Sequence, residues 1–173
     1  MKIYEYKVSG QLNDETPQAI FHNGQQIGEV RRMYSNKLKK KLDQYFDYRY
    51  FLLYEATIES HVYRIKKIFR RGKLWFEGVD QTTNKKTIVT YDNWRIGVPE
   101  LKIIDERAVL KIEKEFEEPS RFYENDEVVA TWQAQYDEHA NIFSLTLIIH
   151  ENATIQDAAF YITISQAALF IGA

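Results

Sequence analysis

Basic side chains gather in three short stretches of the chain, and cations that lie close together can bind phosphate groups. The first stretch contains Arg31, Arg32, Lys37, Lys39, Lys40 and Lys41, the second Arg64, Lys66, Lys67, Arg70, Arg71 and Lys73, and the third Lys85 and Lys86. Each basic residue near an anionic membrane adds about 1 kcal/mol of binding free energy. Such charges also occur on the solvated outer faces of strands, where they keep sheet edges soluble. Both interpretations stay open.

Nucleic acid is the weaker candidate partner for these charges. Proteins that bind single strands stack the bases on exposed aromatic rings. In the second basic stretch, Tyr63 and Phe69 alternate with the basic residues and share the face that we expect to point into the protein. We therefore expect no nucleic-acid partner.

The remaining ionisable residues do not form a recognisable chemical site. The acidic stretches EKEFEE at 113–118 and YENDE at 123–127 could offer oxygens to calcium, but both lack the glycine of an EF-hand loop and read better as acidic hairpins. The four histidines, His22, His61, His139 and His150, show no metal-ligand spacing. No GxSxG elbow or glycine-rich phosphate loop occurs either. The sequence thus predicts no catalytic residue, no metal and no cofactor.

The two ends of the sequence differ in charge. Residues 1–95 carry 18 Lys/Arg against 11 Asp/Glu, whereas residues 96–173 carry 5 against 14, within a net charge of -2. A molecule polarised in this way can steer an anionic surface towards one side, unless strand pairing interleaves the two halves.

Length and composition favour one cytoplasmic domain spanning residues 1–173. A chain of 173 residues can bury a core without disulfides or metals. Cysteine is absent, which excludes thiolate chemistry and Cys-containing zinc sites and fits a reducing compartment. The start, MKIYEYKVSG, is not typical of a signal peptide because Glu5 and Lys7 interrupt its apolar residues. We expect a cytoplasmic protein that can also lie at the periphery of a membrane.

Most of the chain alternates apolar and polar residues with a period of two, which predicts half-buried strands. The expected inward-facing sets are Tyr63, Ile65 and Phe69; Leu110, Ile112 and Phe116; and Val128, Ala130, Trp132, Ala134 and Tyr136. Turn residues follow at 22–25, 70–73, 82–86, 105–108, 123–126 and 137–141. This spacing predicts roughly ten to twelve antiparallel strands in a meander or barrel, without the helical crossovers of a parallel sheet.

Two segments depart from the strand pattern. In residues 35–47, Leu38, Leu42, Tyr45 and Phe46 recur at helical spacing beside lysines, which fits a short helix or a mobile loop across one end of the sheet. The second segment is the C-terminal tail, where Thr154 and Asp157 form a capping-box pattern before an almost wholly apolar run.

A helix that is apolar on all sides lies in lipid or in a protein core. The apolar pieces of the tail are far shorter than the roughly 20 residues of a membrane span, and no basic residue flanks them. A large barrel, by contrast, cannot be filled by the side chains of its own strands. We therefore expect no transmembrane segment, but a buried helix at about 154–171, with Phe160, Tyr161 and Phe170 wedged against the barrel wall.

Three stretches resemble the tubby C-terminal superfamily, which includes the LURP-one-related and phospholipid scramblase-like proteins. They are FHNGQQIGEVRRMY at 21–34, with its glycine turn and "IG" step, NWRIGVPELKIIDERAVLKIEKEF at 93–116, and the tail with the preceding IFSLTLIIH. The resemblance implies a barrel of twelve strands that encloses a hydrophobic C-terminal helix. Tubby proteins hold phosphoinositides with basic side chains on the barrel, but none of those residues can be aligned individually here.

Together these observations predict a non-enzymatic binding or scaffold domain. Its expected partner is an anionic phospholipid or membrane surface, and the alternative is a regulatory domain that binds an unidentified protein. An enzyme with a polar pocket at one end of the barrel stays open as a third function. The candidate ligand-binding residues are Arg31, Arg32, Lys39, Lys40, Lys41, Arg64, Lys66 and Arg70.

Overall fold

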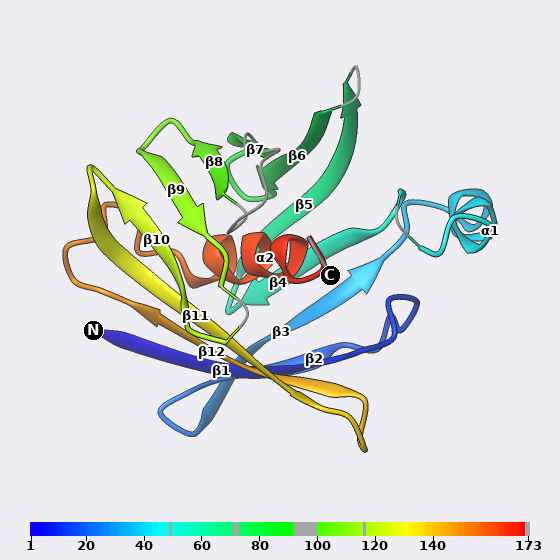
Figure 1. The fold of residues 1–173 in the computed structure, drawn as a ribbon, viewed down its shortest axis with the longest axis horizontal. Coiled ribbons are helices and arrows are strands. Elements are labelled where there is room, and N and C mark those ends of the chain that lie inside the picture. The colour runs from blue at the N-terminus through cyan, green and yellow to red at the C-terminus, as the bar shows by residue number, and fades with distance from the viewer. Residues whose placement is uncertain (49, 71–72, 92–99, 116, 172–173) are drawn as a thin grey trace.

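A computed structural model shows a closed antiparallel barrel around one helix (Figure 1). It describes all residues except 49, 71–72, 92–99, 116 and 172–173. Its strands are β1 (Lys2–Ser9), β2 (Gln18–His22), β3 (Gln25–Met33), β4 (Leu53–Ile58), β5 (His61–Arg70), β6 (Lys73–Asp80), β7 (Lys86–Tyr91), β8 (Glu100–Ile104), β9 (Val109–Glu113), β10 (Ser120–Glu124), β11 (Glu127–Asp137) and β12 (Ile142–Ile149). The helices are α1 (Lys37–Gln44) and α2 (Ala158–Leu169). The predicted mainly β architecture of about twelve strands and a C-terminal helix is confirmed.

The strand order around the barrel follows the order of the chain. Each strand pairs with its sequence neighbours, and β1 closes the ring by pairing with β12 from Lys2 opposite Ile149 to Ser9 opposite Ile142. Tight turns make this meander possible. Asn23 and Gly24 link β2 to β3 with φ of 52° and 75°, a left-handed conformation that suits these residue types.

The "IG" step marks a close approach between two strands. Gly28 in β3 lies opposite Ile58 of β4, near an irregularity in the pairing of β2 with β3. A Cβ atom at Gly28 would lie 2.0 Å from the carbonyl oxygen of Thr57, so the backbones can approach only because this residue has no side chain.

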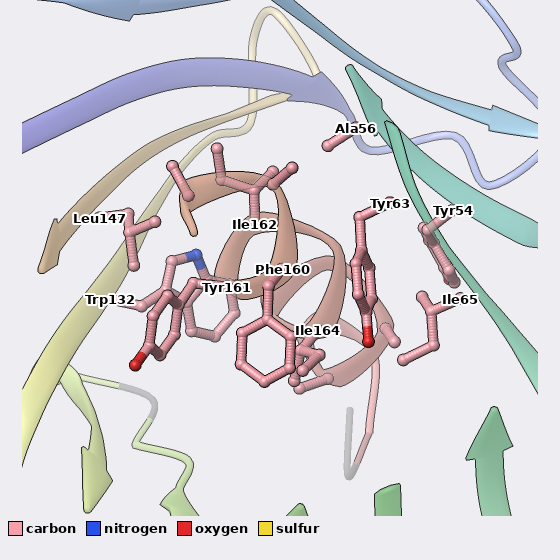
Figure 2. Packing of buried hydrophobic residues seen from close by; sticks show 14 of the residues in the cluster. Tyr54, Ala56, Tyr63, Ile65, Trp132, Leu147, Phe160, Tyr161, Ile162 and Ile164 are labelled. Atoms are coloured by element: carbon pink, nitrogen blue, oxygen red, sulfur yellow. The ribbon is translucent and has the colours of Figure 1, made fainter. Parts of the chain in front are cut away.

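Helix α2 fills the barrel, and every one of its residues is buried. Strands β4 and β5 provide most of its contacts. Figure 2 shows its aromatic and aliphatic side chains directed at the surrounding wall. The expected wedges are confirmed, since Phe160 packs edge-on against Tyr63 and Tyr161 against Phe122, with ring centroids 5.4 and 5.0 Å apart, and Phe170 contacts Phe143.

The N-terminal end of α2 differs from the prediction. The helix begins at Ala158 and not near residue 154, because Asp157 is the N-cap and its carboxylate accepts the backbone N–H of Phe160 at 3.2 Å. Thr154 is instead bound to β10, where its hydroxyl donates to Glu124 over 2.6 Å. No helix in the described part of the chain combines the length and apolar character needed to cross a membrane.

The segment at 35–47 forms the short helix α1, which projects from the barrel between β3 and β4 (Figure 1). Asn36 caps it by accepting the N–H of Lys39 at 2.8 Å. One strand prediction also needs correction. Tyr136 does not join Trp132 in the core, and its side chain is 49% exposed because it lies near the end of the long β11–β12 hairpin.

Candidate functional site

The predicted basic residues divide between three locations. Arg31 on β3 and both Arg64 and Lys66 on β5 lie on the outer face of the barrel, while Lys39, Lys40 and Lys41 belong to α1. Arg32 is inside the barrel. Arg70 ends β5, and its side chain lies outside the part that the structure describes, as does Arg71.

A basic groove of about 650 Å³ lies between the α1 region and the outer face of β4–β6. Lys39 comes from α1, Tyr50 and Phe51 from the segment that follows it, and Arg64, Lys66 and Lys67 from β5; the remaining lining residues are Ser35, Leu52, Leu53, Ile68, Glu77, Val79 and Gln81. Four lining residues are basic and one is acidic. We call this feature the basic groove. It joins the first two basic stretches of the sequence, which the sequence alone could not place together.

Glu55 of β4 holds two arginines at the edge of the basic groove. Its carboxylate accepts Arg31 Nε at 2.9 Å and Arg64 Nε at 2.8 Å, from the strands on either side. Burial opposes ionisation of Glu55, but the hydrogen bonds from Arg64 and Arg31 outweigh it and lower the pKa of this carboxyl. The arginines are therefore oriented and partly neutralised.

A second carboxylate lies between lysines on the same outer face. Glu77 of β6 is 3.0 Å from Lys66 Nζ and 3.6 Å from Lys86 Nζ. The hydrogen bond from Lys66 is the largest of the effects that lower the pKa of Glu77. With two cations around each acid, this face keeps an excess of positive charge.

The lysines of α1 differ in their partners. Lys40 forms an ion pair with Glu15. Lys37, Lys39 and Lys41 form no ion pair with any acidic residue that the structure describes, and Lys39 Nζ lies 6.0 Å from the ring centroid of Phe51. These three amines are available to an external anion.

Arg32 does not belong to the exterior basic surface. Adjacent strand residues point to opposite faces, so Arg31 outside requires Arg32 inside. The Arg32 side chain is only 4% exposed, donates from Nη1 to the carbonyl of Gln11 at 2.6 Å and lies over the ring of Phe170. Burial lowers the pKa of this guanidinium. The period of the strand could have excluded Arg32 from the candidate ligand-binding residues.

A second group of ionisable residues surrounds the N-terminal end of α2. His61 Nε2 lies 3.4 Å from both Asp80 Oδ1 and Asp157 Oδ2. Burial raises the pKa of Asp157, and only part of this effect is offset by the N–H of Phe160 and by nearby positive charge. Asp80 meanwhile accepts the N–H groups of the β6–β7 turn. Capping and turn formation thus account for both carboxylates. No sequence motif links these three residues.

The acidic stretches also have structural partners. Glu113 lies 2.6 Å from Lys111 Nζ, and Glu124 binds Thr154. Within the described residues, no three Asp, Glu or His side chains are grouped closely enough to hold a metal ion.

The positive and negative parts of the sequence occupy different arcs of the barrel. Because strand order follows chain order, β1–β7 form one continuous arc and β8–β12 the other. The excess of basic residues in 1–95 and of acidic residues in 96–173 is therefore not blurred by interleaved strands. The basic groove lies on the positive arc.

Comparison with known families agrees with this architecture. The family model described as "Tubby C-terminal like domain" matches residues 4–171, nearly the whole chain. A search of curated proteins and a search of solved structures gave no match. Of the stretches that carry the resemblance, 21–34 and the tail form β2–β3 and α2, whereas residues 93–99, including Trp94, lie outside the described residues.

Proposed function

Because the chain belongs to the Tubby C-terminal like domain family, we propose that it is a non-enzymatic binding module for the anionic phospholipid surface of a membrane. It would act as a peripheral protein on the cytoplasmic side, where anionic lipids are concentrated. The basic groove would receive the phosphate headgroups.

One observation carries this proposal. Lys39 from α1 and Arg64, Lys66 and Lys67 from β5 line a single open groove. Such a concave arrangement of cations can surround a phosphate more completely than lysines spread over a convex strand face. The aromatic side chains of Tyr50 and Phe51 border the same groove and present apolar surface beside the charges.

The expected affinity is moderate. Each basic residue near an anionic surface adds about 1 kcal/mol, and this contribution falls off within a Debye length. Arg64 and Lys66 contribute less than Lys39 because Glu55 and Glu77 already neutralise part of their charge. Binding should therefore be reversible and sensitive to salt.

Cosedimentation with liposomes tests the proposal. The full chain is mixed with phosphatidylcholine vesicles, with or without phosphatidylserine, at low and moderate salt. We expect binding to the anionic vesicles alone, weakened by salt and by the double substitution Lys66→Gln/Lys67→Gln. The control Lys2→Gln/Lys102→Gln removes two exposed lysines from β1 and β8 and should bind as the unchanged chain does.

The results also separate the alternative function. Absence of binding under every condition refutes the lipid proposal and leaves a protein-interaction domain. Equal weakening by both double substitutions would indicate a diffuse charge effect and refute the role of the basic groove.

A further inference from the structure

Helix α1 is held through its polar side by the segment that follows it and by the β1–β2 connection. Asp43 is fully buried, and its carboxylate accepts the backbone N–H groups of Tyr50 at 2.8 Å and Phe51 at 3.1 Å. Lys40, one turn earlier on the same side, pairs with Glu15. A surface helix normally buries its apolar side. In α1 the polar side is buried instead.

The apolar side of α1, which its C-cap Tyr45 and the next residue Phe46 continue beyond the helix, faces outward as a consequence. Leu38 is 67% exposed, Leu42 42%, Tyr45 85% and Phe46 50%. Five of the eleven large hydrophobic side chains that are exposed in the described structure lie between Leu38 and Tyr50. Such a concentration on one projection is typical of a surface that binds an apolar partner.

Lysines border this apolar side on both edges. At about 100° per residue, Leu38, Leu42 and Tyr45 form one stripe, with Lys37 and Lys41 along one edge and Lys39 along the other. A lysine stem can lie along an apolar surface while its amine remains among phosphate groups. This arrangement is that of a helix lying in a membrane interface.

The projection is held in place before any partner binds. The backbone turns back through Asp47 and Tyr48, which both have positive φ of 53° and 59°. Tyr50 then packs edge-on against Phe46 at 5.2 Å, and Lys67 Nζ of β5 lies 5.2 Å from the Tyr50 ring centroid. The projection should therefore lose little conformational entropy when it docks on a partner.

We propose that α1 inserts its apolar side, formed by Leu38, Leu42, Tyr45 and Phe46, into the boundary between headgroups and acyl chains of an anionic bilayer. Lys37, Lys39 and Lys41 stay at the level of the phosphates. This inference rests on the proposed lipid-binding function and adds an apolar component and a fixed orientation. Charge favours a bilayer over a second copy of the chain, because two α1 helices packed face to face would bring their lysines together.

The absence of cysteine permits a direct test of insertion. The substitution Leu42→Cys introduces one thiol for the environment-sensitive fluorophore NBD. Val109→Cys is the control, since Val109 is 54% exposed on β9 in the negative arc. With vesicles that contain phosphatidylserine, NBD at position 42 should brighten, shift to the blue and be quenched by spin labels on the acyl chains. NBD at position 109 should not change.

A second pair of variants measures the apolar contribution without a label. We expect Leu38→Gln/Leu42→Gln to weaken binding to anionic vesicles about tenfold. This is the order expected when the free energy of transferring two partly exposed leucine side chains from water into the bilayer is lost. The matched control is Ile104→Gln/Val109→Gln, which changes two exposed apolar residues paired across β8 and β9 and should not affect binding. All four positions are exposed, so folding should be preserved.

The outcomes distinguish this inference from the proposed function. Binding that depends on the basic groove, with unchanged NBD emission at position 42, overturns insertion and leaves the lipid-binding proposal intact. No binding by the unchanged chain refutes both. A dimer in sedimentation equilibrium that Leu42→Gln dissociates, without any change in vesicle binding, would assign the apolar side to a second copy and likewise overturn insertion.

Discussion

The amine of Lys114 lies 3.0 Å from the backbone carbonyl oxygen of Leu169 and also donates to the carbonyl of Ile171, so the segment after β9 closes the C-terminal end of the central helix. The last carbonyl groups of a helix have no partners within the helix. In the barrel interior they need another donor, and a cation also suits the negative end of the helix dipole. Lys114 itself is 3% exposed.

Replacing this lysine should therefore destabilise the protein. Lys114→Met keeps the apolar stem but removes the donor, and we expect the free energy of unfolding to fall by about 1 to 3 kcal/mol. Burial lowers the pKa of Lys114 to about 8 from 10.5. Between pH 8 and pH 10.5 the unfolded chain binds more protons at this lysine than the folded protein does, so the unchanged protein gains stability as pH rises. The deficit of the variant should grow in that range. Chemical denaturation at about pH 7 and about pH 9.5 tests this, with exposed Lys102→Met as control. A deficit that shrinks with pH contradicts it.

The central position of α2 predicts sensitivity to added volume. Ala159 and Ala168 are both 0% exposed. Ala159→Leu and Ala168→Leu should each lower the free energy of unfolding by about 1 to 3 kcal/mol, because a packed core cannot accept the extra methyl groups without strain. Thermal unfolding measures the effect, with Ala140→Leu in the exposed β11–β12 turn as control. Unchanged melting temperatures for both core variants would argue against an enclosed helix.

The carboxyl group of Asp157 should contribute more to the stability of the fold in acid than at neutral pH. Its pKa is raised, chiefly by burial, so its contribution to stability is present below the ordinary value of 3.8 and is lost as pH rises through the folded-state pKa. Asp157→Asn keeps a helix cap but carries no charge. It should match the unchanged protein in acid and become relatively more stable at neutral pH.

Two further variants complete this comparison. Asp157→Ala lacks the acceptor for the N–H of Phe160 and should lose about 1 kcal/mol. Asp126→Asn, in an exposed turn, should show no such dependence. Urea denaturation across acidic and neutral pH distinguishes them. Greater loss of stability by Asp157→Asn at neutral pH than in acid would show that the ion pair with His61 outweighs burial.

Glu55 should show the opposite pH dependence. Its pKa is lowered because the hydrogen bonds from Arg64 and Arg31 outweigh burial, so its stabilising contribution is present above the ordinary value of 4.5 and is lost as pH falls through the folded-state pKa. Glu55→Gln should cost about 1 to 3 kcal/mol at neutral pH. The difference from unchanged protein should shrink in acid. Glu29→Gln on neighbouring β3 is the control. A difference in unfolding free energy between Glu55→Gln and the unchanged protein that stays constant across pH would contradict the expectation.

Local patterns in the sequence determined most of the fold. Alternation with a period of two predicted the strands, Asn and Gly marked the β2–β3 turn, and the tail, apolar on all sides, had to be enclosed. Even the inward position of Arg32 follows from its place next to Arg31 on one strand. These features depend on near neighbours in the chain, so they can be read without coordinates.

The tertiary structure alone decided which distant residues meet. The basic groove exists because α1 projects beside β5, and the direction of the apolar side of α1 depends on the buried Asp43. Similarly, His61, Asp80 and Asp157 meet only because α2 begins beside the end of β6, and Thr154 is drawn to Glu124 on β10. Such contacts depend on how the strands stagger as the barrel closes, a property of the whole ring that no short stretch of sequence contains.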